Sequence, residues 1–139
     1  MPDTVRKVDY FSIFVSDKPA QAFNVLSMLV SSGINLLGCS GTKRGRRAQI
    51  DVIPDDTRRF RSAVKKAGLE FKPEKSGFLI QGEDRPGALT EHLRVLGENK
   101  VNVTGIDSIS AGQGRWGAII WVDDGAVSKA SKVLKAKSA

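Results

Sequence analysis

The sequence predicts an α+β protein built from two successive βαββαβ repeats, the second without its last strand. The main observation is an internal duplication, because an offset of 67 residues pairs Asp17 with Asp84 and Pro19 with Pro86. The same offset continues without a gap and pairs Phe11 with Phe78, Ile13 with Ile80, Leu26 with Leu93, Asn35 with Asn102, Gly45 with Gly112 and Ile53 with Ile120. A second observation is that each half alternates β-branched and aromatic runs with apolar residues at helical spacing.

Apolar spacing and turn residues define the elements of the first half. Phe23, Leu26 and Val30 recur at the spacing of a helix face, and Gly33 follows where a helix C-terminus favours glycine. A glycine-flanked turn at 41–45 joins two β-rich runs and predicts a hairpin. The expected order is a strand at 8–15, a helix at 20–32, strands at 34–40 and 47–53, a helix that opens at 54–57 and stops at Gly68, and a strand at 69–71.

The second half repeats this order up to its last helix. We expect a strand at 78–82, a helix at 87–99, strands at 101–110 and 116–122, and a helix at 126–136. The offset places Phe71 opposite Ser138, so the expected fourth strand is absent from this half. The sequence therefore predicts two small domains, 1–74 and 75–139, each ferredoxin-like with its helices on one face of a mostly antiparallel sheet.

The missing strand leaves one edge of the strand at 78–82 without a partner. Bare apolar edges pair readily with other chains, so folded proteins cover them. We expect the cover to come from the N-terminal segment at 4–8, from residues 69–75, or from a second subunit.

The turn at 82–89 is the strongest candidate for a binding site. Asp84 is placed to cap the coming helix, Pro86 has a φ that suits a first helical turn, and Gly87 allows close backbone approach. Amides at such a helix start attract small anions, including carboxylates. The alternative is a well-capped strand-to-helix turn without a ligand.

Composition and single residue types argue against membrane insertion, metal binding and catalysis. The chain has 139 residues, 40% hydrophobic and 27% charged, with no apolar run of membrane-spanning length, so we expect a cytoplasmic protein. Cys39, the only cysteine, is expected to be a small buried hydrophobe, and no cysteine-cluster metal site is possible. His92, the only histidine, is expected to be a satisfied surface or semi-buried residue, and no nucleophile–base pair is evident. We expect no enzyme activity and no cofactor.

Two features meet in each half: a strand followed by a D-x-P-G-x-L-like helix start, and an I-N-I-like strand after the helix. Together they resemble the ACT domain, a small-molecule-binding regulatory module of amino-acid metabolism. The second half matches through 84–89, 100–103 and Gly105. The first half keeps Asp17, Pro19 and 33–36 but has alanine at position 20, where the family has glycine. The resemblance covers nearly the whole chain as a tandem pair.

The resemblance implies that an amino acid or similar effector binds where two ACT domains adjoin. The implied contacts in the second half are Asp84, Arg85, Pro86, Gly87, Ala88 and Asn102. The weaker equivalents in the first half are Asp17, Lys18, Ala20 and Asn35. The amides of Gly87 and Ala88 are suited to a carboxylate and Asp84 to an ammonium group. The alternative role for both asparagines is hydrogen bonding to nearby backbone.

A net charge of +7 raises nucleic-acid binding as the competing function, because RNA-recognition motifs share the βαββαβ order. Basic residues cluster at 43–47, along 58–66 and along the last helix. Base stacking requires aromatic residues on the two central strands, and the strand at 47–53 has none. We therefore favour a regulatory protein, expected to be a homodimer, that acts on a separate protein partner through the basic hairpin at 43–47.

Overall fold

The computed structural model describes residues 3–72 and 75–138 and divides the chain into two compact units. The N-terminal unit comprises Asp9–Lys75, and the C-terminal unit comprises Met1–Val8 together with Ser76–Ala139. Helices and strands alternate in the predicted order, which confirms the α+β class and the two repeats, but the last strand expected to be absent from the second repeat is present as the two-residue β8 (Lys137–Ser138). The first eight residues nevertheless group with the second repeat.

The N-terminal unit is an antiparallel sheet with two helices. Its elements are the second part of β1 (Thr4–Ser16), α1 (Gln21–Ser31), β2 (Leu36–Arg44), β3 (Arg47–Pro54), α2 (Thr57–Lys66) and β4 (Glu70–Phe71). The strand order is β2-β3-β1-β4, with β1 paired on one side to β3 and on the other to the short β4. This is the ferredoxin-like order that the sequence predicts.

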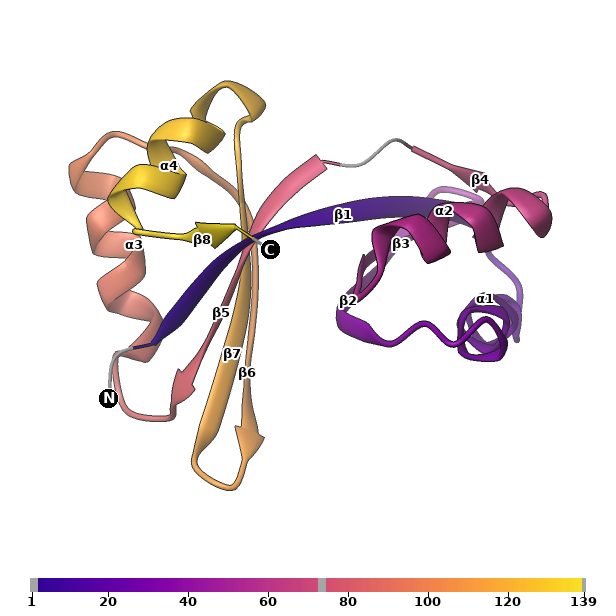
Figure 1. Ribbon diagram of the computed structural model, residues 1–139, viewed down its shortest axis with the longest axis horizontal. Coiled ribbons are helices and arrows are strands. Elements are labelled where there is room, and N and C mark those ends of the chain that lie inside the picture. The colour runs from indigo at the N-terminus through magenta and orange to yellow at the C-terminus, as the bar shows by residue number, and fades with distance from the viewer. Residues whose placement is uncertain (1–2, 73–74, 139) are drawn as a thin grey trace. The chain divides into compact units, whose positions relative to one another are not determined.

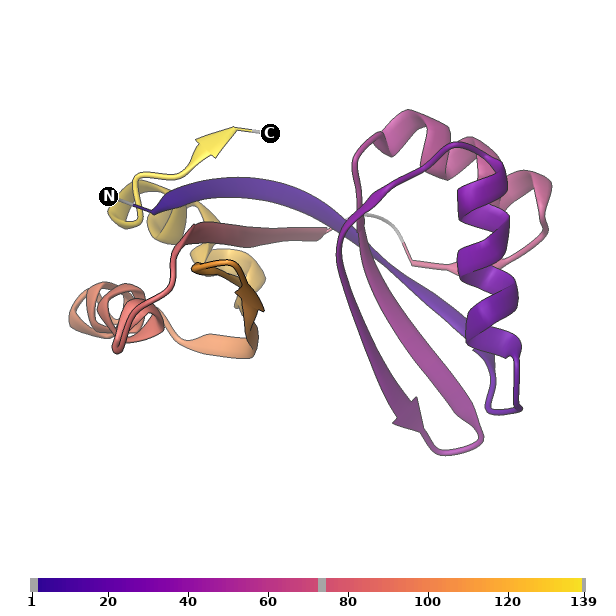
Figure 2. The ribbon, with the colours of Figure 1, turned by 90° about the horizontal axis from the view of Figure 1, so that it is seen from below.

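Alternate residues of β1 build the core of the N-terminal unit. Phe11 and Ile13 are fully buried, and the ring of Phe11 lies 4.5 Å from that of Phe60 on α2. Leu29 on α1 and Val64 on α2 join the same cluster, which explains why both helices lie on one face of the sheet (Figure 2). The buried alternate residues of β1 and the apolar residues of the two helices therefore form one core layer.

The C-terminal unit repeats this plan with a borrowed strand. Its elements are the first part of β1, β5 (Lys75–Glu83), α3 (Ala88–Glu98), β6 (Val103–Gly112), β7 (Arg115–Val122), the 3-10 turn η1 (Asp124–Ala126), α4 (Val127–Val133) and β8 (Lys137–Ser138). The strand order is β8-β1-β5-β7-β6, and α3 and α4 cover one face of this sheet (Figure 1). Phe78, Ile80 and Ile120 point into the core, where they meet Leu96 of α3 and Ala130 of α4.

The exposed edge expected on the strand at 78–82 is covered by the first of the three predicted candidates. Thr4 in β1 donates from its hydroxyl to the carbonyl of Gln81 at 3.3 Å, and Arg6 donates to the Gln81 side chain at 3.4 Å. Val5 and Val8 are buried. The two-residue β8 pairs in parallel with Arg6 and its neighbour on β1, not with β5. Residues from the start of the chain therefore stand where the last strand of the second repeat belongs.

Two local expectations are wrong. The helix expected at 126–136 is a 3-10 turn followed by the shorter α4, and the left-handed φ of +55° at Lys135 lies just beyond its end. Cys39 is exposed, not buried, because β2 is an edge strand with a neighbouring strand, β3, on one side. Desolvation, with the nearby charge of Asp51, raises the pKa of the Cys39 thiol. A raised pKa disfavours the reactive thiolate.

The backbone at the start of the first helix is the same in both repeats. Gly87, which precedes α3, has a φ of +80°, and Ala20, which precedes α1, has a φ of +72°. Left-handed backbone costs roughly 1–2 kcal/mol per residue when a Cβ is present and little for glycine. Ala20 therefore carries strain that Gly87 avoids.

We expect Ala20→Gly to raise the free energy of unfolding by about 0.5–1 kcal/mol, because relief of strain outweighs the greater flexibility of the unfolded chain. Gly87→Ala is the matched reverse change, since a Cβ at Gly87 meets no atom within 4 Å and only the φ opposes it. It should lower stability by a similar amount. Urea unfolding of both variants measures the change in the free energy of unfolding. Changes of the same sign in the two variants would contradict the prediction.

Candidate functional site

The turn between β5 and α3 carries the sequence-predicted binding residues of the second repeat. Asp84, Arg85, Pro86 and Gly87 are exposed, and Ala88 is buried as the first residue of α3. No side chain in the described part of the chain caps α3. The Ala88 N–H donates to the carbonyl of Arg85 at 3.2 Å, so the exposed, left-handed Gly87 is the candidate backbone donor of this turn.

Asp84 does not cap α3, which corrects the role expected for it. Its carboxylate accepts a hydrogen bond of 2.6 Å from the hydroxyl of Ser110, and its backbone N–H donates to the carbonyl of Gly114 at 2.8 Å. Both contacts lie on the β6–β7 hairpin, so the turn is held by the hairpin and its aspartate faces away from the helix amides. The carboxylate is exposed and able to receive an ammonium group.

The first repeat holds its equivalent turn in the same way. The N–H of Asp17 donates to the carbonyl of Arg46 at 3.1 Å, and its carboxylate lies 3.2 Å from the Lys43 ammonium. Lys18 and Ala20 are exposed, and no described side chain caps α1. The Lys43 ion pair neutralises the aspartate, and the Cβ of Ala20 occupies the position that is open at Gly87. The turn of the first repeat is therefore the poorer anion site.

The two asparagines lie away from these turns. Asn102 is exposed and directly precedes β6, whereas Asp84 contacts Ser110 near the far end of that strand. Asn35 bonds through its backbone to both the N–H and the carboxylate of Asp55. The C-terminal unit therefore does not bring Asn102 and the turn between β5 and α3 together. A ligand that contacts both an asparagine of this kind and a turn of this kind needs a second domain to supply one of them.

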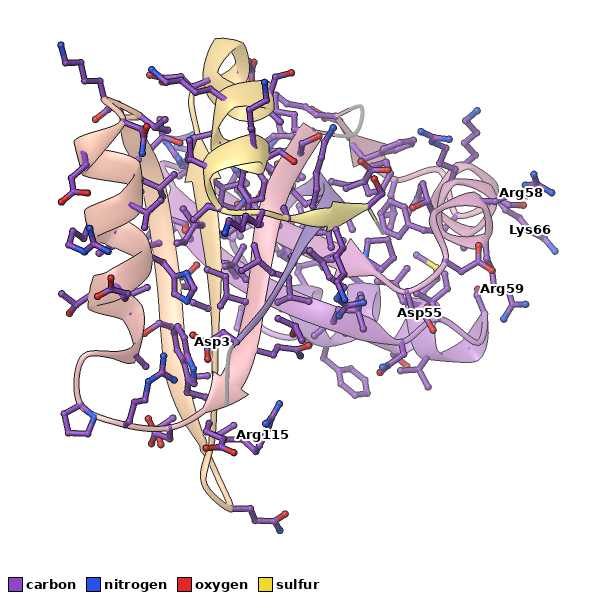
Figure 3. The ribbon with its side chains drawn as sticks, turned by 60° about the vertical axis from the view of Figure 1, so that its left-hand side comes forward. Asp3, Asp55, Arg58, Arg59, Lys66 and Arg115 are labelled. Atoms are coloured by element: carbon purple, nitrogen blue, oxygen red, sulfur yellow. The ribbon has the colours of Figure 1, made fainter. Side chains whose placement is uncertain are left out.

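A cluster centred on Asp3 lies against the inner side of α3 in the C-terminal unit (Figure 3). The Asp3 carboxylate is only 2% exposed. Arg85 donates to both of its oxygens at 3.1 Å, Trp116 Nε1 donates at 3.2 Å, and His92 Nε2 lies at 2.7 Å. An ionised carboxylate only accepts, so the His92 contact requires a proton on Nε2.

The Asp3 carboxyl is ionised by these contacts in spite of its burial. Burial raises the pKa of Asp3. The hydrogen bonds from Arg85, His92 and Trp116 and the charge of Arg85 lower the pKa by a larger amount, so that it falls from an ordinary 3.8 to about 2. The rings of His92 and Trp116 stack with centroids 6.0 Å apart, which fixes two of the donors. The expectation of a satisfied His92 is confirmed, with Asp3 as its partner.

The sequence analysis did not find this cluster. Gly82 makes room for it, because a Cβ there would lie 1.9 Å from an Asp3 carboxylate oxygen. The duplication carries no hint, since the offset pairs Asp3 with Glu70, which lies in β4. Asp3 reaches Arg85, His92 and Trp116 only through the pairing of β1 with β5, so no local pattern in the sequence indicates the cluster.

Among the described residues, no group of three histidine, cysteine, aspartate or glutamate side chains is placed to hold a metal ion. No described helix is both long enough and apolar enough to cross a membrane.

Comparison with known proteins identifies the fold. The solved structure of protein BT0572 from Bacteroides thetaiotaomicron is similar with a TM-score of 0.82 and 21% identity, over 94% of this chain and 88% of that one. The regulatory subunit of aspartate kinase from Thermus thermophilus, in a ligand-free form, is similar with a TM-score of 0.65 and 16% identity, over 97% and 95%. At these identities the likeness shows the fold. A comparison with curated proteins finds no match.

The second repeat also matches a known family. Residues 78–139 match the ACT domain family. The matched segment includes most of β5, the turn, α3 and the elements that follow, and Asp9–Lys75 has the same order of strands and helices. The match covers less than half of the chain, so it is a similarity of the second repeat to the ACT domain.

The Asp3 cluster predicts a specific dependence of stability on pH. The folded-state pKa of about 2 lies below the ordinary 3.8, so this stabilisation is complete above the ordinary value and is lost as the pH falls through the folded value. Asp3→Asn should lower the free energy of unfolding by about 2 kcal/mol near neutral pH and by progressively less toward pH 2. Urea unfolding across this range measures the difference, and a pH-independent difference would contradict the assignment.

Proposed function

We propose that the protein is a non-catalytic regulator that binds an amino acid or a similar small effector at the turn between β5 and α3. The observation that carries the proposal is the exposed, left-handed Gly87 at an uncapped helix start, within a segment that matches the ACT domain. The backbone N–H of Gly87 takes the effector carboxylate and Asp84 takes its ammonium group, whereas the N–H of Ala88 donates to the carbonyl of Arg85 at 3.2 Å and must exchange that bond to take part.

The arrangement of polar groups supports an effector with both charges. The helix start favours negative charge, and the exposed Asp84 carboxylate lies just before it in the same turn. Asn102 offers both a donor and an acceptor from the start of β6, so in this proposal it serves a turn on a second ACT domain. The first repeat contributes less, because Lys43 already pairs with Asp17.

A regulatory role agrees with the structures that share this fold. Those from Thermus thermophilus and Thermus flavus are named as regulatory subunits of aspartate kinase, and each spans nearly the whole of this chain. We propose that this chain likewise acts on a separate protein, and that it does so as a homodimer. The exposed β2–β3 hairpin at 43–47, with Arg44 and Arg46 free of the ion pairs that hold Lys43 and Arg47, is the proposed partner surface.

A thermal-shift screen against the twenty amino acids tests the effector site. A ligand that binds only the folded protein stabilises it by about 2.7 kcal/mol when its free concentration is about 100 times Kd. We expect one amino acid or close relative to raise the melting temperature by several degrees. Asp84→Ala should weaken binding about tenfold or more, which is about 1.4 kcal/mol. No response to any compound at millimolar concentration would contradict the proposal.

Asp56→Ala is the matched control for this experiment. Asp56 caps α2 by accepting from the N–H of Arg59 at 2.9 Å, so its loss lowers stability by roughly 1 kcal/mol without touching the turn. The control should melt earlier but keep the full ligand-dependent rise. An equal loss of response in both variants would mean that Asp84 acts through stability alone.

The basic surface allows a direct test of the competing function. Arg58, Arg59 and Lys66 project outward from α2 (Figure 3), and the hairpin adds Arg44 and Arg46. We expect only weak, non-specific RNA binding that falls steeply between about 50 and 200 mM salt, because it rests on phosphate contacts. Fluorescence anisotropy with two unrelated single-stranded RNAs measures this. Tight binding of one sequence at the higher salt would favour the nucleic-acid function instead.

A further inference from the structure

The Asp3 cluster has the composition of a carboxylate-binding site. Arg85 presents two N–H groups to the two oxygens of one carboxylate, and Trp116 and His92 add one donor each. A planar guanidinium that pairs with both oxygens of a carboxylate is among the strongest and most specific hydrogen-bonding arrangements in proteins. Four donors therefore converge on a single carboxylate group.

The donors and their occupant come from different parts of the chain. Arg85, His92, Trp116 and the Gly82 that leaves room for the carboxylate all lie within residues 78–139, the segment that matches the ACT domain. Asp3 lies outside that segment and reaches the donors only because β1 pairs with β5. The ACT domain thus contains a complete set of carboxylate donors, and the acceptor is supplied from elsewhere.

The segment that follows Asp3 is held by the pairing of β1 with β5 and by the buried Val5 and Val8. The side-chain hydrogen bonds from Thr4 and Arg6 to Gln81 are long, at 3.3 and 3.4 Å. On its other side, among the described strands, this part of β1 pairs with the two-residue β8. Local opening of one such strand requires less free energy than unfolding of the whole domain.

We propose that Arg85, His92 and Trp116 form a carboxylate-binding site that Asp3 occupies in the isolated chain, and that a small organic acid competes with Asp3 for it. A ligand carboxylate in this site excludes Asp3 and weakens the hold of β1 on the C-terminal unit. The site is distinct from the backbone amides at Gly87 and Ala88 and does not depend on the proposed effector function.

The competition sets the concentration at which the ligand acts. A group tethered by a short segment has an effective concentration in the millimolar range, so a free carboxylate must exceed this or make further contacts. Removal of the Asp3 carboxylate abolishes the competition and should increase the apparent affinity of the site for a free carboxylate by about tenfold or more.

Chemical rescue of Asp3→Ala tests the site directly. The substitution removes a carboxylate, and sodium formate or acetate is the probe, with sodium chloride at equal ionic strength as the control. We expect the carboxylates to raise the melting temperature of Asp3→Ala and to shift the indole N–H resonance of Trp116, with Trp121 as the internal reference. The double variant Asp3→Ala, Arg85→Met should lose both responses. Equal responses to chloride and carboxylates, or responses that survive Arg85→Met, would overturn the proposal.

The wild-type chain provides a test that needs no destabilised variant. Acetate at high concentration should speed hydrogen exchange of the amides in 4–8, relative to chloride, because it displaces Asp3 and frees the first part of β1. Amides of β2 in the N-terminal unit serve as the reference. Unchanged exchange in 4–8 at acetate concentrations that rescue Asp3→Ala would overturn the competition. The effector screen stays independent, because it is judged by the Asp84→Ala variant.

Discussion

The unpaired edge of β5 is the constraint on which the C-terminal unit depends. A strand whose inner face carries Phe78 and Ile80 cannot leave its backbone donors and acceptors open at an edge without inviting association. The second repeat ends in a two-residue strand that does not reach this edge. The first part of β1 fills it, and Asp3 then completes the unit by accepting hydrogen bonds from three residues, Arg85, His92 and Trp116.

The two repeats resemble each other more in backbone geometry than in side-chain contacts. Both turns place a residue of left-handed φ before the first helix, and in both the aspartate N–H bonds to a carbonyl of the neighbouring hairpin. The side chains then differ, because Asp17 pairs with Lys43 whereas Asp84 accepts from Ser110. Two halves of equal fold therefore present one turn suited to a ligand and one whose charge is already neutralised.

The features that could be predicted from sequence are those with local or periodic causes. The helical spacing that predicts α1 places Leu26 against the core, and the β-rich run places Phe11 in it, although Phe23 and Val30 of the same spacing are exposed. The features that could not be predicted depend on which strand lies beside which. Cys39 is exposed because β2 is an edge strand, and Asp3 is buried because β1 reaches β5. The role of Asp84 was misjudged because the competing hydroxyl of Ser110 lies 26 residues away in the sequence.

The sharing of β1 between units has a consequence for the order of folding during synthesis. The N-terminal unit has all its strands once Phe71 has been made, so its elements can assemble while the rest of the chain is still being translated. The C-terminal unit needs the first part of β1, which is made before the N-terminal unit, and β5 to β8, which are made after it. Contacts between segments so far apart slow folding. The segment from Asp3 to Val8 therefore has no partner strand in the C-terminal unit until β5 and β7 have been translated.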